Sequence, residues 1–180
     1  MIKKFLTTVL FIVFLLPQAG AKSSGTITKA NKYYTSGKYE QAVSEYQKIL
    51  SKNNTNAKAY EGIIKSYSAF GDKYLGEKEY LKASIKYRSA LFYIHIYNQK
   101  NSDNIFESSE KHLTDLYKKC MKSLKITTNP KSHYQMARLL YSIDETSAAG
   151  YEFSQILKNP KYRTESINTI KEISNELNLN

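Results

Sequence analysis

Residues 27–50 read ITKANKYYTSGKYEQAVSEYQKIL, and this stretch decides the fold. Its apolar side chains recur at helical spacing on both sides of Ser36 and Gly37. Glycine readily adopts the left-handed conformation that ends a helix, so this pair predicts a break. The stretch therefore predicts two helices joined by a short turn, which is a helical hairpin. The apolar face of the second helix consists of Tyr39, Ala42, Val43, Tyr46, Ile49 and Leu50.

The same helical pattern continues along the rest of the chain. The 180 residues include only 7 Gly and 3 Pro, which disfavours turn-rich β architectures. No stretch alternates polar and apolar residues well enough to predict a strand. The sequence therefore predicts an all-α fold of about eight helices. Beyond the first hairpin, helices are expected at residues 57–75, 78–98, 104–126, 131–143, 146–158 and 162–177.

The hairpin at residues 24–56 resembles a tetratricopeptide (TPR) repeat. The resemblance is carried by Ala30, Tyr33, Gly37, Tyr39, Ala42, Tyr46 and Leu50. A second match begins at Tyr60 and resumes at Tyr80, and a third runs from Ala137 to Ile156. Antiparallel hairpins of this family stack into an α-solenoid, so the resemblance implies that architecture here. An unrelated helical bundle is the alternative.

Two expected helices fit the repeat pattern imperfectly. Gly71 within the helix at 57–75 and Gly76 directly after it are expected to weaken this helix or end it early. The helix at 104–126 is either an extra helix or the start of a degenerate hairpin with residues 131–143. Its expected buried face consists of Ile105, Leu113, Leu116, Tyr117, Cys120 and Leu124. A basic stripe elsewhere on it consists of Lys111, Lys118, Lys122 and Lys125.

Residues 1–21 have the features of a secretory signal. Two lysines precede an almost unbroken apolar run at residues 5–16, and small residues follow at Ala19 and Ala21, as in a cleavage site. The apolar run is shorter than the roughly 20 residues that span a bilayer, although an uncleaved membrane anchor is the alternative. The sequence therefore predicts a signal peptide, a TPR-like helical domain at residues 22–180, and a periplasmic or extracellular location.

The formal net charge of +11 is concentrated in the first half of the domain. Residues 22–100 carry 14 basic and 6 acidic side chains, whereas residues 101–180 carry 11 and 10. A basic excess attracts polyanions, so binding of an anionic envelope polymer or a membrane surface is the alternative function. Nucleic acid is not an expected partner of an exported protein. The cations of this run are Lys58, Lys65, Lys73, Lys78, Lys82, Lys86 and Arg88.

Residues capable of catalysis or metal binding are few and scattered. The histidines are His95, His112 and His133, and no two have the spacing of helical metal ligands. Cys120 falls on an apolar helical face, which predicts a buried thiol rather than a nucleophile. The sequence contains no Gly-rich phosphate loop. We therefore expect a non-enzymatic protein without a metal or a cofactor.

The family resemblance also implies a binding surface. In TPR arrays the first helix of each hairpin lines a concave groove that binds extended peptides or helices. Ile27 and Gly62 stand where a polar clamp for a C-terminal carboxylate would be expected, which disfavours that ligand. The resemblance thus implies an exported scaffold that binds a protein or peptide partner in the cell envelope. The groove positions transferred to this sequence are Asn31, Tyr34, Lys58, Glu61, Lys65, Tyr134, Arg138 and Tyr141.

Overall fold

The computed structural model describes residues 19–177 and residue 179, with the backbone alone for residues 19–26. The described part contains eight helices and no strand, so the predicted all-α fold is confirmed there. None of its helices combines the length and the apolar composition that a membrane crossing needs. Residues 1–18 of the expected signal peptide lie outside the described residues. The helices are α1 (Ala19–Thr35), α2 (Tyr39–Leu50), α3 (Ala57–Gly76), α4 (Tyr80–Lys100), α5 (Glu107–Ser123), α6 (Pro130–Ser142), α7 (Thr146–Ser154) and α8 (Arg163–Glu176).

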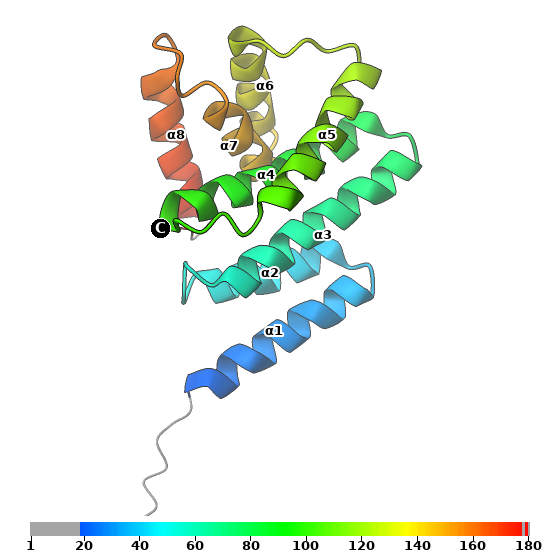
Figure 1. The fold of residues 1–180 in the computed structure, drawn as a ribbon, viewed down its shortest axis with the longest axis vertical. Helices are drawn as coiled ribbons and strands as arrows, with labels where there is room; N and C mark the ends of the chain where they lie inside the picture. Colours follow the sequence, from blue (N-terminus) through cyan, green and yellow to red (C-terminus); the bar gives the residue numbers. More distant parts are fainter. Residues whose placement is uncertain (1–18, 178, 180) are drawn as a thin grey trace, which may run out of the picture.

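The first four helices pack against one another in chain order (Figure 1). Between α3 and α4, the ring of Tyr93 lies against the rings of Tyr60 and Tyr67, with centroid separations of 6.3 and 6.0 Å. The seven-residue spacing of these two α3 tyrosines therefore places them on one packed face, as their sequence positions predict. Each of the four helices also contributes a fully buried alanine: Ala30, Ala42, Ala59 and Ala83.

Helix α4 joins the two halves of the fold. It contacts α3 on one side and both α5 and α7 elsewhere, whereas α6 and α8 contact α7 (Figure 1). Helix α7 is buried at every position from Thr146 to Phe153. Its Gly150 lies against the ring of Phe92 on α4, where a Cβ would overlap that ring. Packing therefore follows chain order as far as α4 and then departs from it, because α7 returns to α4 after α5 and α6.

The turns after α1, α3 and α6 have the same backbone geometry. Each contains one residue in the left-handed region, at Gly37 (φ 70°), Lys78 (φ 61°) and Asp144 (φ 60°). The N–H of the following residue then donates to a carbonyl five residues earlier, as in the Schellman motif. The predicted break at Ser36 and Gly37 is confirmed, and two other hairpins turn in the same way. These bonds run from Lys38 to Tyr33, from Glu79 to Tyr74 and from Glu145 to Leu140, with lengths of 2.9, 2.9 and 3.0 Å.

Counting from these turns places similar side chains at equivalent positions of the three hairpins. The second helix of each carries a fully buried alanine and, one turn later, a buried ring. The first helix carries a small residue that is also buried. The alanines are Ala42, Ala83 and Ala149, the rings are Tyr46, Tyr87 and Phe153, and the small residues are Ala30, Gly71 and Ala137. The three hairpins therefore share a backbone turn and a pattern of small and aromatic residues.

Several expectations about single residues are corrected by the structure. Gly71 does not end α3 early, since the helix continues to Gly76. The ring of Tyr87 occupies the space beside Gly71, which accounts for a glycine at this position. Ile105 is 54% exposed rather than buried, since α5 begins only at Glu107. The prediction that Cys120 is buried is confirmed.

Substitution of Gly150 by alanine tests the contact between α7 and α4. Gly150→Ala is expected to lower the free energy of unfolding by about 1–3 kcal/mol, because the added methyl group must displace the ring of Phe92. Gly76→Ala is the matched control, since a Cβ at position 76 meets nothing within 4 Å. Urea unfolding of both variants should show a loss for the first and no loss for the second. Equal stabilities would contradict the close approach of α7 to α4.

Candidate functional site

A cleft of about 300 Å³ lies between α1 and α3. Five of the eight groove positions transferred from the TPR family meet in it, two from α1 and three from α3. They do so because residues three and four apart share one face of a helix. The cleft is lined by Ile27, Asn31, Tyr34, Tyr46, Lys58, Glu61, Gly62 and Lys65.

The floor of this cleft is the side chain of Tyr46 on α2, which is only 3% exposed. Its ring lies on Gly62, where any Cβ would overlap it, and its hydroxyl donates to Oδ1 of Asn31. Burial raises the pKa of Tyr46, and the charge of Glu61 adds to the shift. Tyr46 therefore remains a neutral hydrogen-bond donor at physiological pH. Gly62, at a position where the family's clamp would be polar, instead allows α2 and α3 to approach.

The rim of the cleft carries a small excess of positive charge. Nζ of Lys65 lies 2.6 Å from Oε1 of Glu61, and both side chains are exposed. Lys58 has no ion-pair partner among the residues that the structure describes. The side-chain amide nitrogen of Asn31 is a further donor at the rim, because the oxygen of the same amide accepts the hydrogen bond from Tyr46. The rim therefore presents donors and one unpaired cation, which suit carbonyl oxygens and a carboxylate.

The remaining three groove positions lie on α6, away from this cleft. Tyr134 donates to both oxygens of Glu165, at 2.9 and 2.8 Å, and stacks on Tyr162 with a centroid separation of 4.6 Å. Nη1 of Arg138 lies 3.3 Å from the same carboxylate. Arg138 and Tyr141 line a separate cleft of about 240 Å³ that also involves α8 residues. The structure thus brings five of the eight positions together and places three elsewhere.

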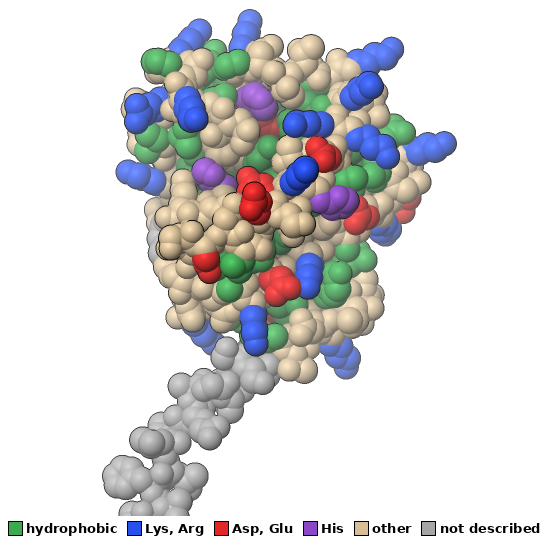
Figure 2. Space-filling model, viewed as in Figure 1, with side chains coloured by type: hydrophobic (Ala, Val, Ile, Leu, Met, Phe, Trp, Pro, Cys, Tyr) green, Lys and Arg blue, Asp and Glu red, His purple; other side chains and the backbone are tan. Residues whose placement is uncertain are grey.

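Four of the seven cations in the basic run of the first half are paired within the chain. Lys65, Lys82 and Lys86 pair with Glu61, Glu79 and Glu145 respectively. Arg88, expected among the surface cations, is fully buried and unavailable to a polymer, which corrects that expectation. In the part of the chain that the structure describes, Lys58, Lys73 and Lys78 have no ion-pair partner. On the face drawn in Figure 2, Lys and Arg side chains are dispersed, with Asp and Glu among them.

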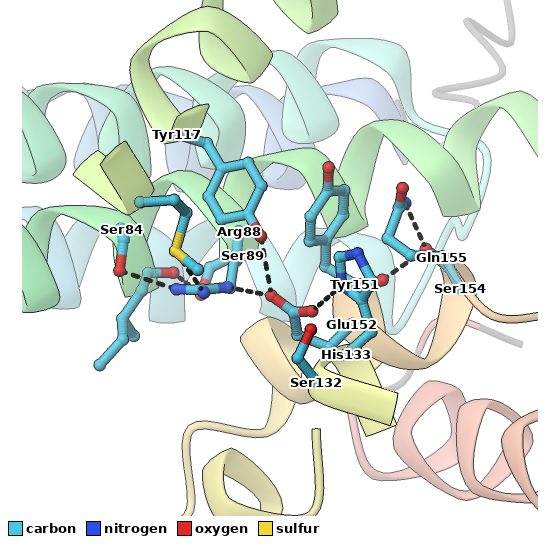
Figure 3. A network of polar contacts seen from close by, with 12 residues as sticks. Ser84, Arg88, Ser89, Tyr117, Ser132, His133, Tyr151, Glu152, Ser154 and Gln155 are labelled. Carbon is cyan, nitrogen blue, oxygen red and sulfur yellow. Dashed lines mark hydrogen bonds and ion pairs between the residues drawn. The ribbon is translucent and has the colours of Figure 1, made fainter. Parts of the chain in front are cut away.

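A buried polar network connects α4, α5, α6 and α7 (Figure 3). At its centre, Nε of Arg88 donates to Oε1 of Glu152, and both side chains are almost fully inaccessible to solvent. Nδ1 of His133 contacts Oε2 of the same carboxylate, and the hydroxyl of Tyr117 donates to Oε1 over 3.3 Å. The guanidinium also donates to Oγ of Ser84 over 2.7 Å and lies 4.7 Å from the centroid of the Tyr117 ring.

The network holds Glu152 in its ionised form. Burial acts to raise its pKa, but the hydrogen bond from His133 and the charge of Arg88 outweigh burial, so the pKa is lowered. Because an ionised carboxylate only accepts hydrogen bonds, Nδ1 of His133 carries a proton. The other ring nitrogen, Nε2, is therefore the one left for any further contact. The sequence did not predict this group, since its central pair, Arg88 and Glu152, is separated by 64 residues.

No group of three or more His, Cys, Asp or Glu side chains that could hold a metal ion is present among the described residues. Burial raises the pKa of Cys120, so its thiol stays protonated at physiological pH.

Comparison of the chain with protein-family models, with curated proteins and with solved structures finds no match in any of the three.

The buried ion pair predicts a large effect for Glu152→Gln. The variant leaves Arg88 buried without a counter-charge, which is expected to cost roughly 3–5 kcal/mol of unfolding free energy. The folded-state pKa of Glu152 lies below its ordinary value of 4.5, so its stabilising contribution is fully present above that value. It is lost as the pH falls through the lowered folded-state pKa. Urea unfolding at decreasing pH should therefore show that the free energies of unfolding of Glu152→Gln and of the unmodified protein become more similar in acid.

The control for this measurement is Glu61→Gln. It removes an exposed carboxylate from its pair with Lys65 and is expected to change stability little, since exposed ion pairs contribute little. A Glu152→Gln variant that is as stable as the unmodified protein at neutral pH would contradict the structural importance of the network.

Proposed function

We propose that this chain is an exported, non-enzymatic, TPR-like scaffold that binds a protein or peptide partner of the cell envelope. The binding site is the cleft between α1 and α3. The observation that carries the proposal is the convergence of five groove positions, from two helices, on one cleft with a buried tyrosine floor. Export rests on the signal-like residues 1–21.

The repeat character of the proposal is supported by the three equivalent hairpins. They share a left-handed turn residue, a Schellman hydrogen bond and a buried alanine at the same distance after the turn. The tyrosine hydroxyls of the first two hairpins are also bound alike, because Tyr46 donates to Asn31 and Tyr87 to Asp72. Stacking of such units into an α-solenoid would place successive first helices along one surface, with α5 as an added helix.

The partner class follows from the size and charge of the cleft. Its volume is near the lower end for ligand pockets, so it suits roughly one or two side chains of a longer segment. Lys58 offers a cation and Asn31 an amide donor, while Tyr34 offers a half-buried aromatic surface. An extended peptide carrying an acidic side chain and free backbone carbonyls matches these groups. The buried floor is already ordered, which reduces the entropic cost of binding.

A photo-crosslinking amino acid placed at position 34 tests this function in the native cell envelope. Position 141, in the separate cleft of α6, carries the same crosslinker as a matched control. We expect a defined adduct at position 34 that is absent at position 141, and its mass spectrum identifies the partner segment. Equal adducts at both positions, or none at position 34, would overturn the assignment of the cleft.

The captured segment, made as a synthetic peptide, then provides a quantitative prediction. Tyr34→Ala should weaken its binding about tenfold, as expected for an aromatic contact residue at an interface. Tyr141→Ala should leave the affinity within about twofold of the unmodified protein.

Isothermal titration at low and at physiological salt separates binding of a peptide in the cleft from binding of an anionic polymer or membrane surface. Binding through the cleft should depend weakly on salt, whereas a steep loss would favour recognition of a polyanion.

A further inference from the structure

A second cavity, of about 600 Å³, lies beside the buried network. It is formed by one face of α5, the connection to α6, the start of α6 and part of α7. Its volume is well within the range of cavities that hold small molecules. Its walls include Thr127, Thr128, His133 and Gln155.

The floor of this cavity is apolar and aromatic. Tyr117, Met121 and Tyr151 are all buried, and the two tyrosine rings meet edge to face with centroids 5.7 Å apart. The hydroxyl of Tyr117 is bound to Glu152, so the network holds this ring in place at the floor. Burial raises the pKa of Tyr117 to about 12, which keeps the phenol neutral. The floor therefore suits an aromatic or otherwise flat apolar group.

The edge of the cavity is positively charged. Lys118 and Lys122 are one helical turn apart on α5, both are exposed, and neither has an ion-pair partner in the described part of the chain. None of the lining residues is Asp or Glu. These two lysines belong to the basic stripe of α5, which the cleft between α1 and α3 does not use.

The negative charge of Glu152 behind the cavity is already compensated. One carboxylate oxygen accepts from Arg88 and Tyr117, and the other is bound by His133. Glu152 is 1% exposed, whereas the side chain of His133 is 15% exposed and lines the cavity. The ring nitrogen Nε2 of His133 is not used by the network and adds a polar contact at the cavity wall. An anion that enters thus meets two unpaired cations and no exposed carboxylate.

We propose that this cavity binds a small organic anion. The apolar body of the ligand packs on Tyr117, Met121 and Tyr151, and its carboxylate, sulfonate or phosphate group lies between Lys118 and Lys122. The site is separate from the proposed peptide cleft, so either assignment can fail without the other.

The test uses 2-naphthoate and its uncharged analogue 2-naphthamide, titrated into the full chain and followed by amide chemical shifts in NMR spectra. The amides of Thr127, Thr128 and Gln155 report on the cavity itself. We expect the resonances of these amides to shift in a saturable manner with naphthoate. Naphthamide cannot form ion pairs with the two lysines, so we expect it to bind at least about fivefold more weakly. Equal affinities would overturn the recognition of charge. Shifts confined to other residues would overturn the site.

Two pairs of substitutions on α5 complete the test. Lys118→Gln combined with Lys122→Gln should weaken naphthoate binding about tenfold. Lys111→Gln combined with Lys119→Gln removes the same charge from the same helix outside the cavity and should change the affinity less than about twofold. Equal losses in both pairs would show general attraction to net charge and would contradict the proposal. The dispersion of each spectrum reports whether the variant is folded.

Discussion

The ion pair between Arg88 and Glu152 is the contact on which the second half of the structure depends. It joins α4 to α7 across 64 residues of sequence, and both side chains are almost fully buried. Burial of two charges costs several kcal/mol for each ion unless their hydrogen-bonding capacity is used. The chain meets this condition with Ser84, Tyr117 and His133, which come from α4, α5 and α6. Any sliding of α7 along α4 would leave these charges unpaired, so the network limits α7 to one position.

Contacts of an aromatic ring with a glycine allow the helices to come close enough for this arrangement. Tyr46 lies on Gly62, Tyr87 beside Gly71, and Phe92 on Gly150. The first contact forms the floor of the cleft between α1 and α3, and the third brings α7 against α4. Since well-packed interiors resist compression and rearrangement, the floor of the proposed peptide cleft is ordered. The two proposed sites use different helices, α1 to α3 for the cleft and α5 to α7 for the cavity.

The three similar hairpins follow partly from local sequence and partly from tertiary packing. A left-handed turn residue at Gly37, Lys78 and Asp144 reverses the chain in the same way three times. Only the first of these three left-handed positions is glycine, because Lys78 and Asp144 occupy the other two. The helices themselves were predictable because their apolar residues have a period close to 3.6. The prediction that Ile105 is buried was wrong because this residue precedes the start of α5. The prediction that Gly71 ends α3 early was wrong because this glycine accommodates the ring of Tyr87.

The sequence by itself determined the all-α class, the existence of the eight helices and most of their buried faces, because helical periodicity is a local property. The resemblance of the hairpins to TPR repeats also implied eight groove positions, of which five converge on the cleft. Only the tertiary structure decided that Arg88 is buried, that His133 meets Glu152, and that Tyr134 and Arg138 bind Glu165 instead of sharing that cleft. The reason is physical. These contacts join side chains distant in sequence, and their formation depends on how whole helices pack rather than on the spacing of residues along any one of them.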